Sequence, residues 1–205
     1  GRLWVGSWEG LLVKDANECL VSMGEPEDAI LALCEHAGGG IWIGTQSSGL
    51  FFLPMDGTQV LRKVEGLPSD TIRALHRDAE GLLWIATSRG LACLIGHSRD
   101  KDAQTGTQSR IFCFTPEHGM PDDDILQLLD DEQGALWVGT RHNLYRINRQ
   151  DLLNVATGRG NVLPLRVFGK GDGLSARLAG GIHQGPLNMR TPDGQLWFAT
   201  QGGIA

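Results

Sequence analysis

The chain has 205 residues, a formal net charge of −6 and no run of Lys and Arg, which argues against a surface for nucleic acid. No stretch of about 18 consecutive apolar residues predicts a transmembrane helix. The 29 glycines, about twice ordinary usage, lie among short apolar runs and predict many tight turns between short strands. The sequence opens inside a repeat at Gly1, so the lack of a signal segment is uninformative about the parent protein.

One short pattern occurs five times along the chain, each time around a tryptophan. It reads GRLWVGSWEGL in the first copy and GLLWIATSRGL in the third. A Gly lies three residues before each Trp, a Gly or Ala two residues after it, and a Ser or Thr three residues after it. The small residue predicts close approach of a neighbouring sheet, and the hydroxyl can hydrogen-bond to the turn backbone. The anchoring residues are Trp4, Trp42, Trp84, Trp137 and Trp197.

A further glycine follows each Trp by six or seven residues, except that the fourth copy has Asn143 at this place. Because Asn is the next most tolerant residue of positive φ after Gly, this exchange predicts a left-handed turn. Upstream of three tryptophans, Ile and Leu recur three residues apart, after the turn-rich segments EPEDA, LPSDT and MPDDD. These pairs are Ile30 and Leu33, Ile72 and Leu75, and Ile125 and Leu128.

Each complete unit therefore predicts a first strand, the Trp strand, a third strand and a fourth apolar run, joined by turns. Four short antiparallel strands in a unit of roughly 40–60 residues are typical of a propeller blade. We expect an all-β chain, a β-propeller of four-stranded antiparallel blades, with residues 1–205 forming a single domain. Polar insertions lengthen the later units, and residues 150–156 fit one short helical turn. An ordinary β-sandwich is the alternative, but it does not require five copies of one turn.

The four cysteines, Cys19, Cys34, Cys93 and Cys113, match no zinc or redox motif. Each lies in an apolar run, so we expect buried thiols within strands. A Cys93–Cys113 bridge between neighbouring strands is the alternative.

The third unit, GLPSDTIRALHRDAEGLLWIATSRGL, and the fourth, GMPDDDILQLLDDEQGALWVGTRHNL, resemble the two-component regulator propeller repeat. Asp78 and Asp131 occupy the acidic position of that repeat, whereas the second unit has His36 there. The last unit, GDGLSARLAGGIHQGPLNMRTPDGQLWFATQGGIA, lacks the spaced Ile and Leu pair. Its longer, glycine-rich form resembles the final blade before the small β-sandwich that often follows these propellers.

The resemblance implies a ligand-sensing ectodomain of a bacterial inner-membrane receptor, and therefore a periplasmic location. The output domain of such a receptor is a histidine kinase, often a hybrid one, or a diguanylate cyclase, and no motif of either lies in this chain. The family's propellers usually have seven blades, of which this chain would supply about four to five. The implied partners are a small-molecule or oligosaccharide ligand, the remaining blades, a following β-sandwich and a second copy in a homodimer. No cofactor is implied.

Four polar residues are candidates to face a ligand in the central channel, because they lie in or near the expected innermost strands. They are Arg73, His76, Arg177 and His183. Trp8 is a fifth candidate, since it lies in a turn, where an aromatic ring can stack on a sugar. The anchoring tryptophans are interpreted as packing residues between blades, because their place in the repeat is constant. The alternative for the polar candidates is an exposed position on a strand.

Three other chemistries fit the sequence poorly. The acidic runs 122–124 and 130–132 lack the alternate spacing of a calcium loop and favour turn capping. Ser175, with His183 and Asp193, has no nucleophile elbow around it. The segment GKGDGLSARLAGG has no phosphate-loop spacing. We therefore predict no catalytic and no metal-binding residue in this chain.

Two functions of other classes remain open. A propeller enzyme, such as a polysaccharide lyase or a glycosidase, needs paired carboxylates or a metal cluster converging on the channel. A purely structural scaffold for dimerisation needs no ligand site.

Overall fold

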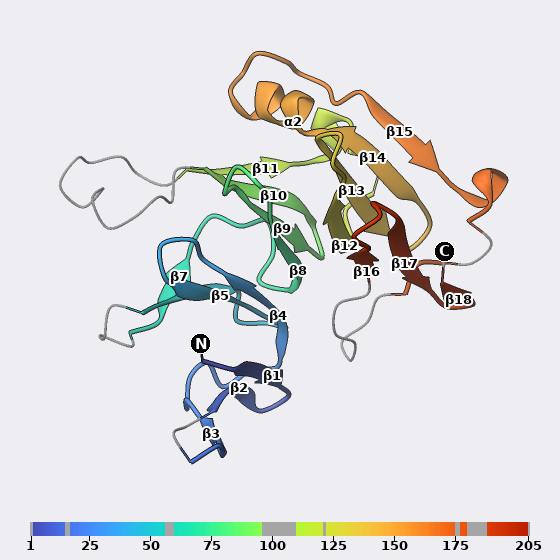
Figure 1. Cartoon of the computed structure of the whole chain (residues 1–205). Helices are drawn as coiled ribbons and strands as arrows, with labels where there is room; N and C mark the ends of the chain where they lie inside the picture. The colour runs from blue at the N-terminus through green and yellow to red at the C-terminus, as the bar shows by residue number, and fades with distance from the viewer. Residues whose placement is uncertain are drawn as a thin grey trace.

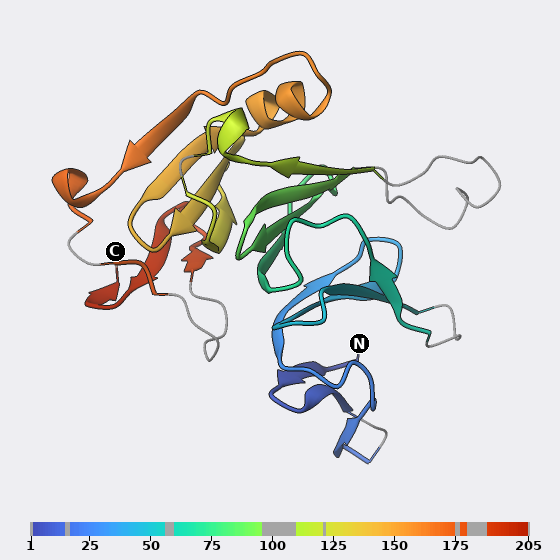
Figure 2. The same ribbon diagram turned by 180° about the vertical axis from the view of Figure 1, so that it is seen from behind.

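The computed structural model describes residues 2–14, 17–55, 60–95, 110–120, 122–174, 177–179 and 188–204. They form five small antiparallel sheets, three of four strands and two of three strands. In both views the sheets follow one another as blades around an arc (Figures 1 and 2). The predicted all-β propeller architecture is therefore confirmed for five blades, of which the first and last have three strands instead of four.

The blades are numbered I to V along the chain. Blade I comprises β1 (Trp4–Ser7), β2 (Gly10–Lys14) and β3 (Leu20–Ser22). Blade II comprises β4 (Ile30–Glu35), β5 (Gly40–Thr45), β6 (Leu50–Pro54) and β7 (Arg62–Val64). Blade III comprises β8 (Ile72–Arg77), β9 (Leu83–Thr87), β10 (Gly90–Ile95) and β11 (Arg110–Phe114).

Blade IV comprises β12 (Ile125–Asp130), β13 (Ala135–Thr140), β14 (Leu144–Asn148) and β15 (Leu165–Phe168). Blade V comprises β16 (Asn188–Arg190), β17 (Leu196–Thr200) and β18 (Gly203–Ile204). In the described ranges, short helical segments also connect strands, namely η1 (Pro116–His118), α2 (Arg149–Ala156) and η2 (Lys170–Asp172). The strands β4, β8, β12 and β16 lie toward the centre of the arc and are the innermost strands of blades II to V (Figure 1).

The small residue two positions after each Trp is where neighbouring blades approach most closely. A Cβ added to Gly44 would lie 2.6 Å from Ile72 Cγ2, an atom of the next blade. A Cβ added to Gly6 would lie 2.8 Å from the Ile30 side chain, and a Cβ added to Gly139 would lie 2.8 Å from the Leu178 side chain. The predicted close approach is therefore confirmed, and it pairs each of these small residues with an aliphatic residue of the following blade.

The anchoring tryptophans fill the space between consecutive blades. Trp84 is fully buried in one apolar cluster with Ile125 and Leu128 of blade IV. Trp42 is 1% exposed and packs with Ile72 of blade III. Trp197, in the last blade, is 39% exposed. The interpretation of these residues as packing residues between blades is confirmed where a next blade is present.

The innermost strands share a β-bulge near their first residue. In blade III, Ile72 pairs with Thr87 and Ala74 pairs with Ala86, so Arg73 is the extra residue. The same shift follows Ile30 in blade II and Ile125 in blade IV. In blade V the corresponding pairs are Leu178 with Thr200 and Asn188 with Phe198, which stand ten residues apart in the sequence. The spaced Ile and Leu pair is therefore missing from the last unit.

The left-handed turn predicted from Asn143 is wrong for this residue. Gly10, Gly90 and Gly203 have φ values of 128° to 134°, but Glu18 is the one non-glycine with positive φ in the described part of the chain. Hydrogen bonds hold Asn143 in the turn instead. Its backbone N–H donates to Thr140 Oγ1 at 3.2 Å. Its side chain also donates to the Tyr145 hydroxyl at 3.1 Å. A polar network therefore replaces the glycine conformation in blade IV.

The helical turn predicted near residues 150–156 is confirmed as α2, which spans Arg149–Ala156. The Asn148 side chain caps its first turn by accepting from the backbone N–H of Gln150 at 2.8 Å. Leu152 and Val155 bury one face of the helix in the same apolar cluster as Trp84. The insertion in the fourth unit is thus packed onto the rim of the blades.

All four cysteines are free thiols. The alternative Cys93–Cys113 bridge is wrong because Cys93 pairs with Phe112 while Cys113 pairs with Ala92. Adjacent positions of a strand point to opposite faces of the sheet, so the two thiols enter different apolar clusters. Burial raises the pKa of the Cys93 thiol to about 12. The expectation of four buried thiols is confirmed for Cys93 and wrong for the others, because Cys34 and Cys113 are half-buried and Cys19 is exposed.

Candidate functional site

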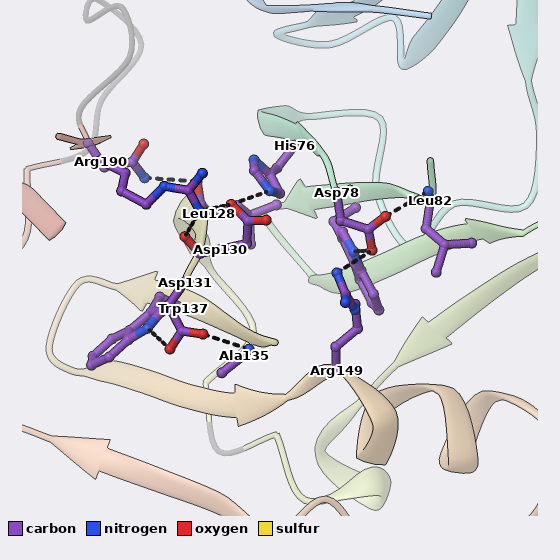
Figure 3. Close-up of polar contacts among 12 residues, drawn as sticks. His76, Asp78, Leu82, Leu128, Asp130, Asp131, Ala135, Trp137, Arg149 and Arg190 are labelled. Atoms are coloured by element: carbon purple, nitrogen blue, oxygen red, sulfur yellow. Dashed lines mark hydrogen bonds and ion pairs between the residues drawn. The ribbon is translucent and has the colours of Figure 1, made fainter. Parts of the chain in front are cut away.

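A chain of polar side chains joins the innermost strands of blades III, IV and V (Figure 3). His76 on β8 lies with Nε2 3.4 Å from Asp130 Oδ1 at the end of β12. Arg190 on β16 lies with an Nη1 atom 3.4 Å from the same Asp130 oxygen. Asp130 therefore contacts both neighbouring blades, and the three side chains form one polar contact across the wall that faces the centre of the arc.

A second polar contact lies at the other end of the same strands. Arg73, the bulge residue of β8, places Nε 3.4 Å from Asp124 Oδ1, just before β12. Arg141, in the turn between β13 and β14, donates from Nε to Asp124 Oδ2 at 3.0 Å. The bulge turns Arg73 toward blade IV, because it adds one residue to the alternation of the strand.

Four buried side-chain atoms in the described part of the chain have no hydrogen-bond partner. They are Arg73 Nε, His76 Nε2, Asp124 Oδ1 and Gln127 Oε1. The two ion-pair contacts at 3.4 Å are within reach of electrostatic attraction but longer than an aligned hydrogen bond of about 2.7–3.2 Å. A buried polar atom left unpaired costs about 1–3 kcal/mol. These four residues, together with Asp130 and Arg190, are called the polar wall, because they place buried polar atoms without an aligned hydrogen bond on or next to the innermost strands.

Gln127 connects this wall to blade V. Its Nε2 donates to the backbone carbonyls of Ala179 at 2.7 Å and of Ala199 at 3.0 Å. Asn188 of blade V donates in return to the Leu128 carbonyl at 3.0 Å. The amide nitrogen of Gln127 therefore forms hydrogen bonds from blade IV to blade V, while its Oε1 atom accepts no hydrogen bond.

Burial favours the neutral form of the His76 side chain. Burial lowers the pKa of His76, while the nearby Asp130 and Asp78 carboxylates raise it and Arg190 lowers it, and the balance is a pKa below the ordinary value. A neutral imidazole has one nitrogen that donates and one that accepts, so it suits a ligand that carries hydroxyl groups.

We expect His76→Gln to reduce the loss of unfolding free energy that the chain undergoes as the pH falls below about 6.5. The folded-state pKa of His76 lies below its unfolded value near 6.5, so the unfolded chain takes up the proton first as the pH falls. The stability from neutral His76 is complete above about pH 6.5 and is lost as the pH falls through the folded pKa. The loss is about 1.4 kcal/mol for each pH unit that separates the two pKa values.

Urea unfolding at pH 7.5 and pH 5.5 measures this difference between the parent chain and His76→Gln. The control is His142→Gln, which removes an exposed histidine. Equal acid sensitivity of His76→Gln and the parent chain would contradict the prediction.

Charged residues alternate in sign at the last position of the innermost strands. Glu35, Arg77, Asp130 and Arg190 occupy this position in blades II to V, each opposite an aliphatic residue of the Trp strand. Asp130 and Arg190 are in direct contact. The alternation places residues of opposite charge at equivalent positions of neighbouring blades, and the attraction is direct for Asp130 and Arg190.

The acidic residues Asp78 and Asp131 have a structural role in the turns. Asp78 accepts the Trp84 indole N–H at 2.9 Å and the Leu82 N–H at 2.9 Å, and it lies 3.6 Å from Arg149 of blade IV. Asp131 accepts the indole N–H of its own tryptophan in the same way (Figure 3). The turn capping predicted for this part of the acidic runs is confirmed.

The structure brings together two of the five predicted ligand residues. Arg73 and His76 lie on the polar wall between blades III and IV. Arg177 is exposed beside the bulge of blade V, where its carbonyl accepts the Gln201 N–H at 2.8 Å. Trp8 is 52% exposed in the hairpin of blade I, two blades away from Arg73. His183 lies outside the described residues, as does Ser175.

The partners of these residues have little signal in the sequence. Asp124 and Asp130 belong to acidic runs that favour turn caps, and Arg190 stands in no recurring pattern. Gln127 has one signal, because the equivalent positions of blades II and III hold Ala32 and Ala74. A polar residue at a place otherwise occupied by alanine marks a blade whose inner wall differs from the others.

No group of three or more His, Cys, Asp or Glu residues that could hold a metal ion occurs among the described residues. None of the described helices is long and apolar enough to span a membrane.

The molecule is thus a domain of propeller blades, joined by buried tryptophans and carrying a polar wall on its innermost strands. Residues 66–89 and 119–142 match the family model of the two-component regulator propeller. These segments contain the innermost strand and the Trp strand of blades III and IV. The match of these two segments confirms the resemblance seen in the sequence. No curated protein matches the chain.

Solved structures resemble the chain over nearly its whole length. An extracellular domain described as part of a putative hybrid two-component system from B. thetaiotaomicron matches 99% of this chain and 26% of its own, with a TM-score of 0.74 and 20% identity. A second such domain from the same organism matches 99% of this chain and 30% of its own, with a TM-score of 0.62 and 16% identity. Virginiamycin B lyase from Staphylococcus aureus matches 98% of this chain and 60% of its own, with a TM-score of 0.61 and 13% identity.

These similarities establish the fold, which receptors and lyases share. The chain spans roughly a quarter to a third of the length of the two extracellular domains that it resembles. The function must therefore be argued from the polar wall of this chain.

Proposed function

We propose that this propeller is a ligand-sensing part of the periplasmic ectodomain of a bacterial transmembrane receptor, whose output is a histidine kinase or a diguanylate cyclase. The family of blades III and IV supports the receptor class, as does the fold of the extracellular domains described above. The observation that carries ligand binding is the set of buried polar atoms without an aligned hydrogen bond, on or next to the innermost strands. In this proposal the segment itself performs no catalysis.

The chemistry of the wall favours a small molecule or oligosaccharide with several hydroxyl groups. Arg73 Nε is a donor that faces the acceptor Asp124 Oδ1 at 3.4 Å without an aligned hydrogen bond, and Gln127 Oε1 is a further acceptor. A hydroxyl group both donates and accepts, so a polyhydroxylated ligand satisfies this mixed set without bringing a charge that repels either residue type. Satisfying these atoms removes the cost of leaving them unpaired.

Binding at this wall is coupled to the arrangement of the blades. The wall includes side chains of blades III, IV and V, joined through the contacts of Asp130. A ligand shifts a receptor only when it binds one arrangement more tightly than another. A ligand that contacts Arg73 and His76 favours the arrangement that brings their strand to β12, and so can transmit its presence along the arc.

The parent protein is proposed to supply further blades to a larger ring, as the usual seven-bladed form of the family would require. Trp42 and Trp84 are covered by the innermost strand of the next blade, whereas Trp197 is 39% exposed. Met189 and Ile204 of blade V are exposed as well. A following blade with an aliphatic residue over Ala199 would bury this face in the same way as the preceding blades do.

The test begins with thermal unfolding of the chain against a panel of oligosaccharides and small polar metabolites. A ligand that binds only the folded chain raises the unfolding temperature. For any ligand found, titration calorimetry compares the parent chain with Arg73→Gln and His76→Gln. We expect each change to weaken binding by roughly tenfold or more, because a hydrogen bond to a charged or buried partner contributes about 1.5–3 kcal/mol.

Lys170→Gln is the matched control, because Lys170 is an exposed cation in η2 beyond the outermost strand of blade IV. Binding to this variant should equal binding to the parent chain. A ligand that binds the Arg73 and His76 variants with unchanged affinity contradicts the assignment of the site to the polar wall.

A further inference from the structure

A hollow of about 620 Å³ lies on the rim between blades III and IV. Arg110 and Phe112 of β11, the outermost strand of blade III, form one wall. Glu117 and His118 of η1 form a second wall, and residues from Val155 to 161, at the end of α2 and just beyond it, form the third. Figures 1 and 2 show β11 and α2 side by side on the outer side of the arc, away from β8 and β12.

The walls of this rim pocket are fixed by the core beneath them. Val155 is buried in the apolar cluster that contains Trp84. The backbone N–H of Leu163 donates to the His118 carbonyl at 2.9 Å, which ties the segment after α2 to η1. The rings of Phe112 and His118 meet edge to face with centroids 5.2 Å apart. The pocket is therefore a preformed feature, and its volume lies in the range of about 300–1,000 Å³ typical of small-molecule sites.

The pocket has two opposite charges and one apolar surface. Neither the Arg110 guanidinium nor the Glu117 carboxylate is paired with another described side chain. Arg159, just beyond α2, donates from Nε to Thr157 Oγ1 at 3.2 Å and opposes the negative end of the helix, so Glu117 is the anionic group of the pocket. Phe112 and Val155 supply the apolar surface between them. The combination is one cation site, one anion site and a small hydrophobic wall.

We infer that the rim pocket binds a small zwitterion with an apolar body, namely an α-amino acid or a short peptide with both ends free. Arg110 pairs with the carboxylate, because a guanidinium forms two parallel hydrogen bonds to a carboxylate. Glu117 attracts the ammonium group, and the apolar side chain packs on Phe112. This second site is separate from the polar wall and does not depend on the function proposed for it.

The experiment titrates the whole chain with leucine, phenylalanine and leucyl-phenylalanine and follows binding by calorimetry. Three comparison ligands each lack one feature, namely N-acetyl-leucine without the ammonium group, leucinamide without the carboxylate, and glycine without the apolar body. We expect saturable binding of at least one complete zwitterion and at least tenfold weaker binding of its incomplete relatives. Absence of saturable binding for all three complete zwitterions overturns the inference.

Variants of the pocket test the location. Arg110→Gln and Glu117→Gln should each weaken binding at least tenfold, and both should unfold at the parent temperature because the two side chains are exposed. The controls are Arg89→Gln and Glu132→Gln, which make the same charge changes at exposed positions outside the pocket. Binding that survives both pocket variants overturns the assignment. Binding that is lost in His76→Gln instead of Arg110→Gln also overturns it and moves the site to the polar wall.

Discussion

Trp84→Ala should lower the free energy of unfolding by about 3–5 kcal/mol, the range for truncation of a buried aromatic residue. Trp84 is fully buried between blades III and IV, where it packs with Ile125 and Leu128. The truncation also leaves Asp78 without the indole N–H that it accepts at 2.9 Å. Urea unfolding of the parent and variant chains, followed by circular dichroism, measures the change.

Trp8→Ala is the matched control for this prediction, because the Trp8 side chain is 52% exposed. A surface substitution of this kind should change the free energy of unfolding by less than about 0.5 kcal/mol. Equal effects of the two substitutions would show that blades III and IV are not joined through Trp84, and the packing scheme between blades would then be wrong.

Gly44→Val should lower the free energy of unfolding by about 3 kcal/mol, the upper part of the usual range for overpacking. The Cβ atom alone would lie 2.6 Å from Ile72 Cγ2 and 3.0 Å from Ile72 Cβ. Ile72 is fully buried and lies on the innermost strand of the next blade, so the two blades must separate to make room. Thermal unfolding of the variant measures the loss.

The comparison variant Gly171→Val adds the same side chain in η2, where no atom lies within 4 Å of an added Cβ. This variant should change the free energy of unfolding by less than about 0.5 kcal/mol, as surface substitutions usually do, and so should unfold close to the parent temperature. Gly44→Ala provides an intermediate case, because the equivalent position of blade III naturally holds Ala86 against Ile125. If the valine variant is as stable as the parent chain, close approach of blades at this residue does not limit stability.

The repeat in the sequence predicts the blades because the same physical demand recurs in each of them. The tryptophan of one blade must be covered by the next blade, whose Ile and Leu pair stands twelve and nine residues before its own tryptophan. A neighbouring strand must come close, so position two after Trp is Gly or Ala. These demands involve residues at fixed spacing, and a single sequence displays them without an alignment. The prediction of a left-handed turn at Asn143 fails because hydrogen bonds to Thr140 and Tyr145 hold this residue, and such bonds do not recur from repeat to repeat in the sequence.

The candidate site is predictable only in part. Arg73 and His76 stand out because they are polar residues on a strand whose place the repeat defines. Their partners Asp124 and Asp130 do not, since adjacent acidic residues in a sequence resemble a capped turn. Arg190 cannot be assigned to an innermost strand from the sequence, because the last unit lacks the spaced Ile and Leu pair that defines the register in the other units.

The sequence by itself determined the class of fold, the succession of blades and the residues that pack between them. These features depend on contacts between a residue and its counterpart one repeat away. Only the tertiary structure decided which polar side chains meet, because His76, Asp130 and Arg190 come from three different blades. It also decided the rim pocket, since β11 and α2 come together through packing on the core beneath them. Whether two such side chains meet depends on their distance in space, and the number of residues between them in the sequence does not determine that distance.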